Sequence, residues 1–338
     1  MSNELGRAYK QKSDAKKAEE KRNFQIILGS SLVIGIVLLI VAYSAFTAYY
    51  LQPRSVVLTI DNQTYTVEDI IDRGIYYTRD GQIEIDTPRG IAISVIERLK
   101  VDEVIKQFHS LLIPQVTLEE IDFALLNQHN VPFQGDNMYS VEKQSLLDDA
   151  ITKYLKEYKT DRDLYEKIFS EQIYRDRLYS HFLGQVEVQG THYNLMVARM
   201  GNRSEGERFF AELEGLDLED DSAVNQLFSD TSLIDPVVGW IPADVLPKKI
   251  LSALTSTEVG GYTKLIDRGL FFEVYKIFEK SDDREFSSDN MALIGKVRMS
   301  NWIESIQQTI LVDENMSPDQ QVLIDEKVID TFTAFGRP

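Results

Sequence analysis

Residues 270–278 read LFFEVYKIF, and residues 193–198 read YNLMVA. In the second stretch the residues alternate between two faces of an extended chain, with Tyr193, Leu195 and Val197 on one face. The first stretch is apolar almost throughout. Both stretches are therefore predicted to be β-strands.

The residues between these two strands predict helices and turns. Helical spacing of apolar residues occurs at 205–213, 223–228 and 246–254, and a turn-rich stretch covers 229–240. Gly260 and Gly261 break the chain before a predicted edge strand at 262–266. The order β, α, α, α, β predicts a compact α+β unit.

The preceding residues, 54–186, are predicted to be mainly helical after a small hairpin. The hairpin consists of strands at 56–60 and 63–66, joined by a turn at Asp61 and Asn62. A helix begins at Val67, and Thr117 with Glu120 forms a capping box at the start of another. Further amphipathic helices are predicted at 89–112, 141–158 and 163–186.

A membrane anchor is predicted near the N-terminus. Residues 23–53 contain no acidic or basic side chain, and their apolar core is long enough for one helix to cross a bilayer. The first 22 residues carry a net charge of +3, so the remainder of the chain carries −21. Basic residues stay on the cytoplasmic side of a membrane. The sequence therefore predicts a basic tail inside (1–22), a transmembrane helix (23–52, with residues 24–51 in the membrane) and an extracytoplasmic remainder.

The composition excludes several classes of protein. The chain has no Cys, which excludes a disulfide scaffold and thiolate chemistry, and its four His form no HExxH motif. A net charge of −18 disfavours nucleic-acid binding. No metal and no cofactor are expected, and the acidic residues around 212–221 lack the spacing of a calcium loop.

Residues 191–280 resemble a parvulin-type (PpiC or rotamase) peptidyl-prolyl isomerase domain. The resemblance rests on the opening strand, the segment LFSDT at 227–231, the pair Gly239-Trp240, the pair Leu246-Pro247 with Ile250, the Gly260 turn and the strand after Gly269. The hairpin and helices before it resemble the chaperone domain of the SurA, PrsA and PpiD class of envelope folding factors. In that class a helix after the isomerase domain packs back on the chaperone domain, and residues 291–308 fit this helix.

The resemblance implies three further regions with their boundaries. A chaperone lobe covers 53–188, an inserted isomerase-like domain covers 189–281, and a C-terminal helix and tail that return to the chaperone lobe cover 282–338. The fold class is thus α+β behind an N-terminal transmembrane helix.

The positions that carry catalytic residues in parvulins are altered in this chain. Asn194 and Phe271 occupy the two usual His positions, and Thr231 occupies the usual Cys or Asp position. His192 lies two residues from the first of these positions and is the alternative working residue. The resemblance places the substrate-binding residues at Val238, Leu246, Ile250 and Phe272, although each of them also suits a core.

Weak or absent isomerase activity with retained polypeptide binding is the resulting expectation. Prolyl isomerisation breaks no covalent bond, and its barrier of about 18–20 kcal/mol comes from amide resonance. A pocket that binds the planar and twisted amides equally well does not accelerate the reaction.

Two functions remain open from the sequence. The first is a membrane-anchored folding factor for unfolded or newly exported polypeptides, at the cytoplasmic membrane of a bacterium. The second is a non-catalytic scaffold or docking subunit of an envelope translocation or assembly complex. Protection of several unrelated unfolded proteins favours the first, and copurification with one partner favours the second.

Overall fold

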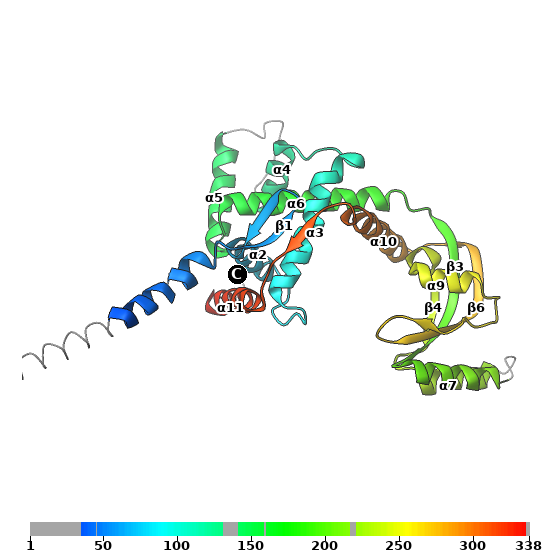
Figure 1. The fold of residues 1–338 in the computed structure, drawn as a ribbon. Helices are drawn as coiled ribbons and strands as arrows, with labels where there is room; N and C mark the ends of the chain where they lie inside the picture. Colours follow the sequence, from blue (N-terminus) through cyan, green and yellow to red (C-terminus); the bar gives the residue numbers. More distant parts are fainter. Residues whose placement is uncertain (1–34, 45, 131–140, 159, 217–220, 336–338) are drawn as a thin grey trace, which may run out of the picture. The chain divides into compact units, whose positions relative to one another are not determined.

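A computed structural model of the chain describes residues 35–44, 46–130, 141–158, 160–216 and 221–335 (Figure 1). The chain divides into two compact units. The first unit comprises residues within 1–100, 148–164 and 311–338, and the second comprises 101–147 and 165–310. The predicted limits of the isomerase-like domain, 189 and 281, both lie inside the second unit.

The predicted membrane anchor lies only in part within the described residues. Residues 35–44 are helical, and a short helix η1 (Thr47–Leu51) follows. Among the helices that the structure describes, none is both long and apolar enough to cross a bilayer. The basic tail (1–22) and residues 23–34 and 45 of the predicted span lie outside the described residues.

The first unit is built on a three-stranded antiparallel sheet in the order β2-β1-β7. Its strands are β1 (Val56–Ile60), β2 (Gln63–Thr66) and β7 (Val312–Glu314). Helix α2 (Val67–Arg79) begins in a capping box, because the side chain and main chain of Thr66 bond reciprocally with Asp69. Helix α11 (Pro318–Phe335) packs on α2, where a Cβ on Gly74 would lie 2.9 Å from Val328. Only glycine permits this close approach.

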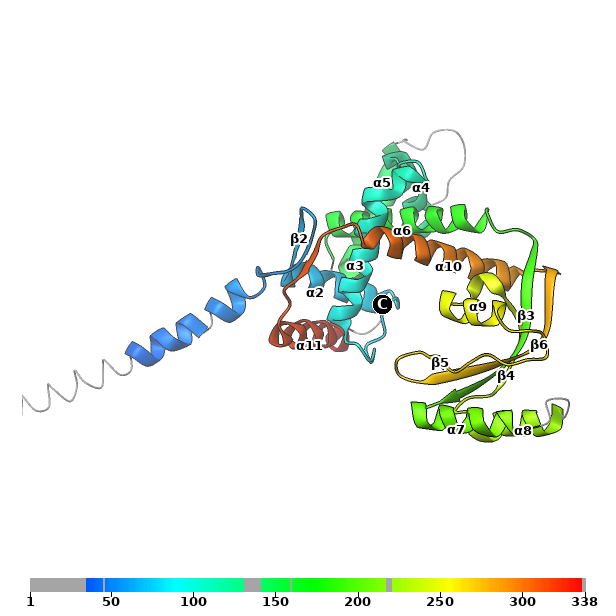
Figure 2. The same ribbon diagram turned by 45° about the vertical axis from the view of Figure 1, so that its right-hand side comes forward.

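The second unit contains a four-stranded antiparallel sheet in the order β4-β3-β6-β5. Its strands are β3 (Gln189–Met200), β4 (Val237–Pro242), β5 (Ile266–Asp267) and β6 (Phe272–Glu285). Helices α7 (Arg203–Glu214) and α8 (Asp221–Thr231) cover one face, and α9 (Lys248–Thr255) covers the other (Figure 2). Leu195 and Ile277 face α9, whereas Met196 and Val274 face α7 and α8.

A helical cluster forms the rest of the second unit. Tyr174, Leu178 and Phe182 of one helix pack against Val104, Ile105 and Ile303 of two others. The helices and turns outside the sheet are α3 (Ile91–Phe108), η2 (His109–Leu111), α4 (Leu118–Gln128), α5 (Val141–Tyr158), α6 (Arg162–Leu183), η3 (Ala243–Val245) and α10 (Ser288–Gln307). Helices α3, α5 and α6 each contribute residues to both units.

Two elements differ from the sequence prediction. The stretch predicted as turns, 229–240, contains most of β4, because Val237, Gly239 and Trp240 pair with β3 across a bulge. The predicted edge strand at 262–266 is reduced to a bridge from Tyr262 to Lys276 and the short β5. The residues after 281 return to the predicted 53–188 region: Ile303 of α10 packs with Val104 and Leu178, β7 pairs with β1, and α11 packs on α2.

Candidate functional site

The two predicted catalytic positions lie far apart on the strand pair β3–β6, with Asn194 in the middle of β3 and Phe271 directly before the first residue of β6. Asn194 is opposite Glu279 and donates to its carboxylate at 3.4 Å, whereas Phe271 immediately precedes the residue that pairs with Met200. Six residues of strand separate Asn194 from Met200, which corresponds to about 20 Å at the usual rise per residue. The structure therefore does not bring these two positions together.

Phe271 and the residues after Thr231 meet instead around Arg199. Thr231 ends α8, and the next residue, Ser232, accepts the Arg199 N–H through its hydroxyl at 3.1 Å. The N–H of Leu233 then donates to the Arg199 carbonyl at 2.9 Å. On the other side, the Arg199 guanidinium lies 4.2 Å above the Phe271 ring. Arg199 is thus the β3 residue that links these two parts of the domain.

A buried ionic cluster occupies this end of the sheet. Arg199 donates from Nε and Nη2 to Oε1 of Glu273, at 2.9 and 2.7 Å. The Tyr275 hydroxyl donates to the other Glu273 oxygen at 2.9 Å, and Arg268 Nε lies 3.6 Å from that same oxygen. The Glu273 side chain is only 2% exposed, while those of Arg199 and Arg268 are about one-third exposed. Both oxygens of this carboxylate are therefore engaged.

The cluster holds no group that is prepared to transfer a proton. Burial, followed by the negative charge of Glu273, raises the pKa of Tyr275 well above its ordinary value, so this phenol stays protonated. Glu273 is tied to two guanidinium groups and the phenol. The arrangement fixes the two Arg side chains and presents their remaining donors to solvent.

The predicted substrate-binding residues do not line one pocket. Ile250 is 4% exposed and Leu246 is half-buried, and both belong to the core between α9 and the sheet. Phe272 packs in the core on the opposite face, beneath α7 and α8. Val238 lies on the edge strand β4 and is 36% exposed. Of these four residues, Val238 offers the most accessible apolar surface.

His192 is a core residue in this structure. It is 1% exposed, its Nδ1 lies 2.9 Å from the Gly190 carbonyl oxygen, and its ring lies 4.9 Å from that of Phe286. A side chain so completely covered has no access to a peptide. His192 therefore occupies a structural position.

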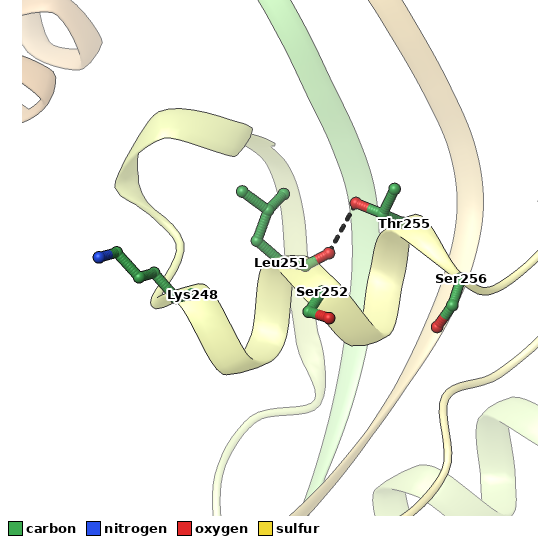
Figure 3. Close-up of a pocket in the computed structure, with 5 residues that line it drawn as sticks. All are labelled: Lys248, Leu251, Ser252, Thr255 and Ser256. Atoms are coloured by element: carbon green, nitrogen blue, oxygen red, sulfur yellow. Dashed lines mark hydrogen bonds between the residues drawn. The ribbon is translucent and has the colours of Figure 1, made fainter.

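A shallow pocket of about 410 Å³ lies along the solvent side of α9 (Figure 3). Its lining residues are Lys248, Leu251, Ser252, Thr255 and Ser256. The Thr255 hydroxyl is already bonded to the Leu251 carbonyl at 2.7 Å. All five residues come from α9 and the position directly after it, so the pocket is a surface hollow.

A second hollow, of about 520 Å³, lies on α6 in the helical cluster. Ile113, Pro114 and Ile173 give it an apolar lining, and it also includes Asp176, Arg177, Ser180 and His181. Arg177 is paired with Glu120 of α4. Leu111 and Leu118, which lie near Ile113 in the chain, are 64% and 80% exposed. This part of the unit therefore presents apolar surface to solvent.

Sequence reasoning missed the Arg199–Glu273 pair, although a signal was present. Arg199 shares its strand phase with Leu195 and Val197, and Glu273 shares its phase with Tyr275 and Ile277. A charged residue in the core phase of each of two strands indicates a buried ion pair if the strands are neighbours. The pairing of β3 with β6 was the information that the sequence lacked.

Comparison with known proteins gives matches among solved structures alone. No protein-family model and no curated protein sequence matches the chain. The foldase PrsA of Streptococcus pneumoniae is 11% identical, with 81% of this chain and 97% of that chain covered and a TM-score of 0.29. The peptidyl-prolyl isomerase PrsA of Bacillus anthracis is 9% identical, with coverages of 71% and 97% and a TM-score of 0.38. One of two SurA-like chaperones of Campylobacter jejuni is 12% identical, with coverages of 57% and 90% and a TM-score of 0.27. Similarity at these scores does not establish what this chain binds or does.

Proposed function

We propose that this protein is a membrane-anchored folding factor that holds unfolded or newly exported polypeptides outside the cytoplasmic membrane of a bacterium, with little or no prolyl isomerase activity. The sheet unit is the part that would contact the polypeptide. Its resemblance to a parvulin domain supplies the class of ligand, and its site geometry argues against catalysis.

One observation carries this proposal. The end of the sheet where Phe271 and the residues after Thr231 converge is occupied by an ion pair, and exposed apolar residues lie on the turns and the edge strand next to this end. Leu233, Val237 and Leu270 are 66%, 65% and 89% exposed. Apolar side chains exposed together favour contact with an apolar partner. An unfolded polypeptide supplies such a partner.

The helix at 35–44 supports membrane anchoring. Every large side chain from Ile36 to Val41 is apolar and 50–71% exposed. These consecutive residues point to all sides of the helix, and a helix that is apolar all round is stable inside a protein core or a membrane. The charge-free run 23–53 and its basic flank agree with an N-terminus inside the cell.

Two assays on the full chain in lipid nanodiscs test the function. The first measures isomerisation of a prolyl peptide, and the second measures light scattering from several unrelated denatured proteins during dilution into buffer. We expect suppression of aggregation with isomerisation near the level of empty nanodiscs. Failure to protect any substrate, together with copurification of one stoichiometric partner, would replace this proposal by the scaffold alternative.

Two variants with Val→Ser substitutions test whether β4 is the contact surface. Val237→Ser with Val238→Ser removes exposed apolar surface from β4, and Val259→Ser removes a 56% exposed valine near the Gly260 turn. We expect the first change to weaken suppression of aggregation several-fold and the second to leave it unchanged. Equal effects would mean that β4 is not the contact surface.

A further inference from the structure

The ionic cluster contains two cations around one anion. Arg199 uses Nε and one Nη2 hydrogen on Glu273, and Arg268 reaches this carboxylate with Nε alone. Among the described residues, no further hydrogen bond or ion pair engages the two guanidinium groups. Both side chains are about one-third exposed, so several of their N–H donors are accessible to a ligand. The cluster contains two positive charges and one negative charge.

The two guanidinium groups are held in place before any ligand arrives. The Arg199 guanidinium is held by its hydrogen bonds to Glu273 and by its contact with the face of the Phe271 ring. Arg268 lies in the turn between β5 and β6, which a hydrogen bond from its N–H to the Phe271 carbonyl closes at 3.0 Å. Gly269 makes this turn possible with a φ of +90°. Since the side chains are already ordered, a ligand loses less entropy on binding than it would with free arginines.

Charges of both signs lie next to the cluster. The Glu205 carboxylate accepts the N–H of Gly201, two residues after Arg199, at 3.0 Å. The Asp267 carboxylate accepts the Gly269 N–H at 2.7 Å, while Lys249 donates to the main-chain carbonyl of Asp267. Arg203 is paired with Glu207 on α7. The remainder of the acidic chain is screened beyond roughly 8 Å at physiological salt, so the local charge decides which ligand is attracted.

We infer that Arg199 and Arg268 form a binding site for a carboxylate of a bound polypeptide. A guanidinium presents paired donors that match the two oxygens of a carboxylate. Leu270 lies two residues after Arg268, and the Leu233 N–H donates to the Arg199 carbonyl. Both leucines are largely exposed, so they supply apolar contacts for the residues next to that carboxylate. The carboxylate comes from the C-terminus of the polypeptide or from an Asp or Glu side chain. This inference rests on the proposed function, because it specifies what the sheet unit recognises.

Fluorescence anisotropy with labelled apolar octapeptides tests the inference on the full chain in zwitterionic nanodiscs. Four peptides are compared: one with a free C-terminal carboxylate, one with a C-terminal amide, one amidated with an internal Glu, and one amidated with an internal Lys. We expect a carboxylate to tighten binding about tenfold over the neutral amide, as for a charge-assisted hydrogen bond. The first and third peptides show which source of carboxylate is preferred.

Variants of the two arginines are the decisive controls. Arg268→Gln removes one cation without breaking the bonds between Arg199 and Glu273, and we expect it to reduce the preference for a carboxylate to within twofold. Arg268→Lys should restore part of it. Arg203→Gln removes an exposed cation of the same unit and should leave the preference intact.

Three results would overturn the inference. They are equal affinity for all four peptides, no binding of any peptide, and an unchanged carboxylate preference in Arg268→Gln with the wild-type circular dichroism spectrum. If Arg268→Gln does not fold, persistence of the wild-type preference in 0.5 M NaCl would count against the inference in the same way. Suppression of aggregation on the same preparation decides the proposed function separately, since it requires no carboxylate site.

Discussion

Replacement of Arg199 by Met should destabilise the sheet unit strongly. The change removes two hydrogen bonds, of 2.9 and 2.7 Å, from a Glu273 carboxylate that is 2% exposed, together with the stacking on Phe271. Removing one partner of a buried ion pair costs about 3–5 kcal/mol, because the other charge remains buried and unpaired. Tyr275 and Arg268 still contact Glu273, so we expect a loss of about 3 kcal/mol.

Intrinsic tryptophan fluorescence reports on this change. The two Trp residues of the chain are Trp240 on β4 and Trp302 on α10, and both belong to the second unit. For a unit of this size, about 3 kcal/mol corresponds to a fall in melting temperature of roughly 6–12 °C. The melts are recorded on full chains in the same detergent.

A double-mutant cycle separates the ion pair from general damage. Glu273→Gln removes the negative charge but keeps an acceptor for Tyr275. The double variant Arg199→Met with Glu273→Gln should therefore lose less unfolding free energy than the two single variants lose in sum. Arg203→Met on α7, whose side chain is 77% exposed, should change the melting temperature little. A melt of Arg199→Met within 2 °C of the wild type would refute the reasoning, because Glu273 would then not depend on Arg199.

Three further predictions address chemistry, pH and topology. Asn194→His with Phe271→His should leave isomerase activity at background, since the register places the two side chains about 20 Å apart. Burial and nearby carboxylates raise the pKa of Asp72 to about 6. Since the ordinary pKa is 3.8, the destabilisation from ionised Asp72 is nearly absent at pH 3, grows as the pH rises towards 6 and is complete at pH 7.5. Asp72→Asn should therefore raise the melting temperature at pH 7.5 and hardly at pH 3. The chain should stay in the membrane fraction after alkaline washing, with the residues after 52 open to external protease.

Each of these predictions has a contrary result. Activity well above background in the double His variant would mean that the two strands are paired differently. An equal effect of Asp72→Asn at both pH values would assign its role to packing. Release of the chain by alkali, or protection of the large domain in intact cells, would remove the anchor from the proposed function.

Local sequence patterns predicted most elements because their determinants lie within a few residues. The hairpin strands at 56–60 and 63–66 and the helix at 141–158 have the predicted bounds. The Thr117–Glu120 capping box is present as well, with the Glu120 main-chain N–H donating to the Thr117 hydroxyl at 3.3 Å. Capping and periodicity are properties of adjacent residues, so a single sequence contains them.

Contacts between distant residues could not be predicted in the same way. Strand β7 has three residues and gains its structure from β1, where Leu58 pairs with Glu314. Strand β4 contains Gly239, which has a φ of +77° and pairs with Leu195 of β3. From the sequence alone, a glycine at this position indicates a turn. The register of β3 on β6 likewise decided that Arg199, and not Asn194, lies near Phe271.

The position of the charge cluster also bears on catalysis. An isomerase must stabilise the twisted prolyl amide more than the planar one. A carboxylate held by Arg199 and Arg268 is separate from that amide, and its contacts remain the same whether the prolyl bond is cis, trans or twisted. Binding of this kind raises the affinity for a polypeptide and leaves the barrier unchanged. A site built from fixed arginines around Glu273 therefore suits a protein that holds its ligand without isomerising it.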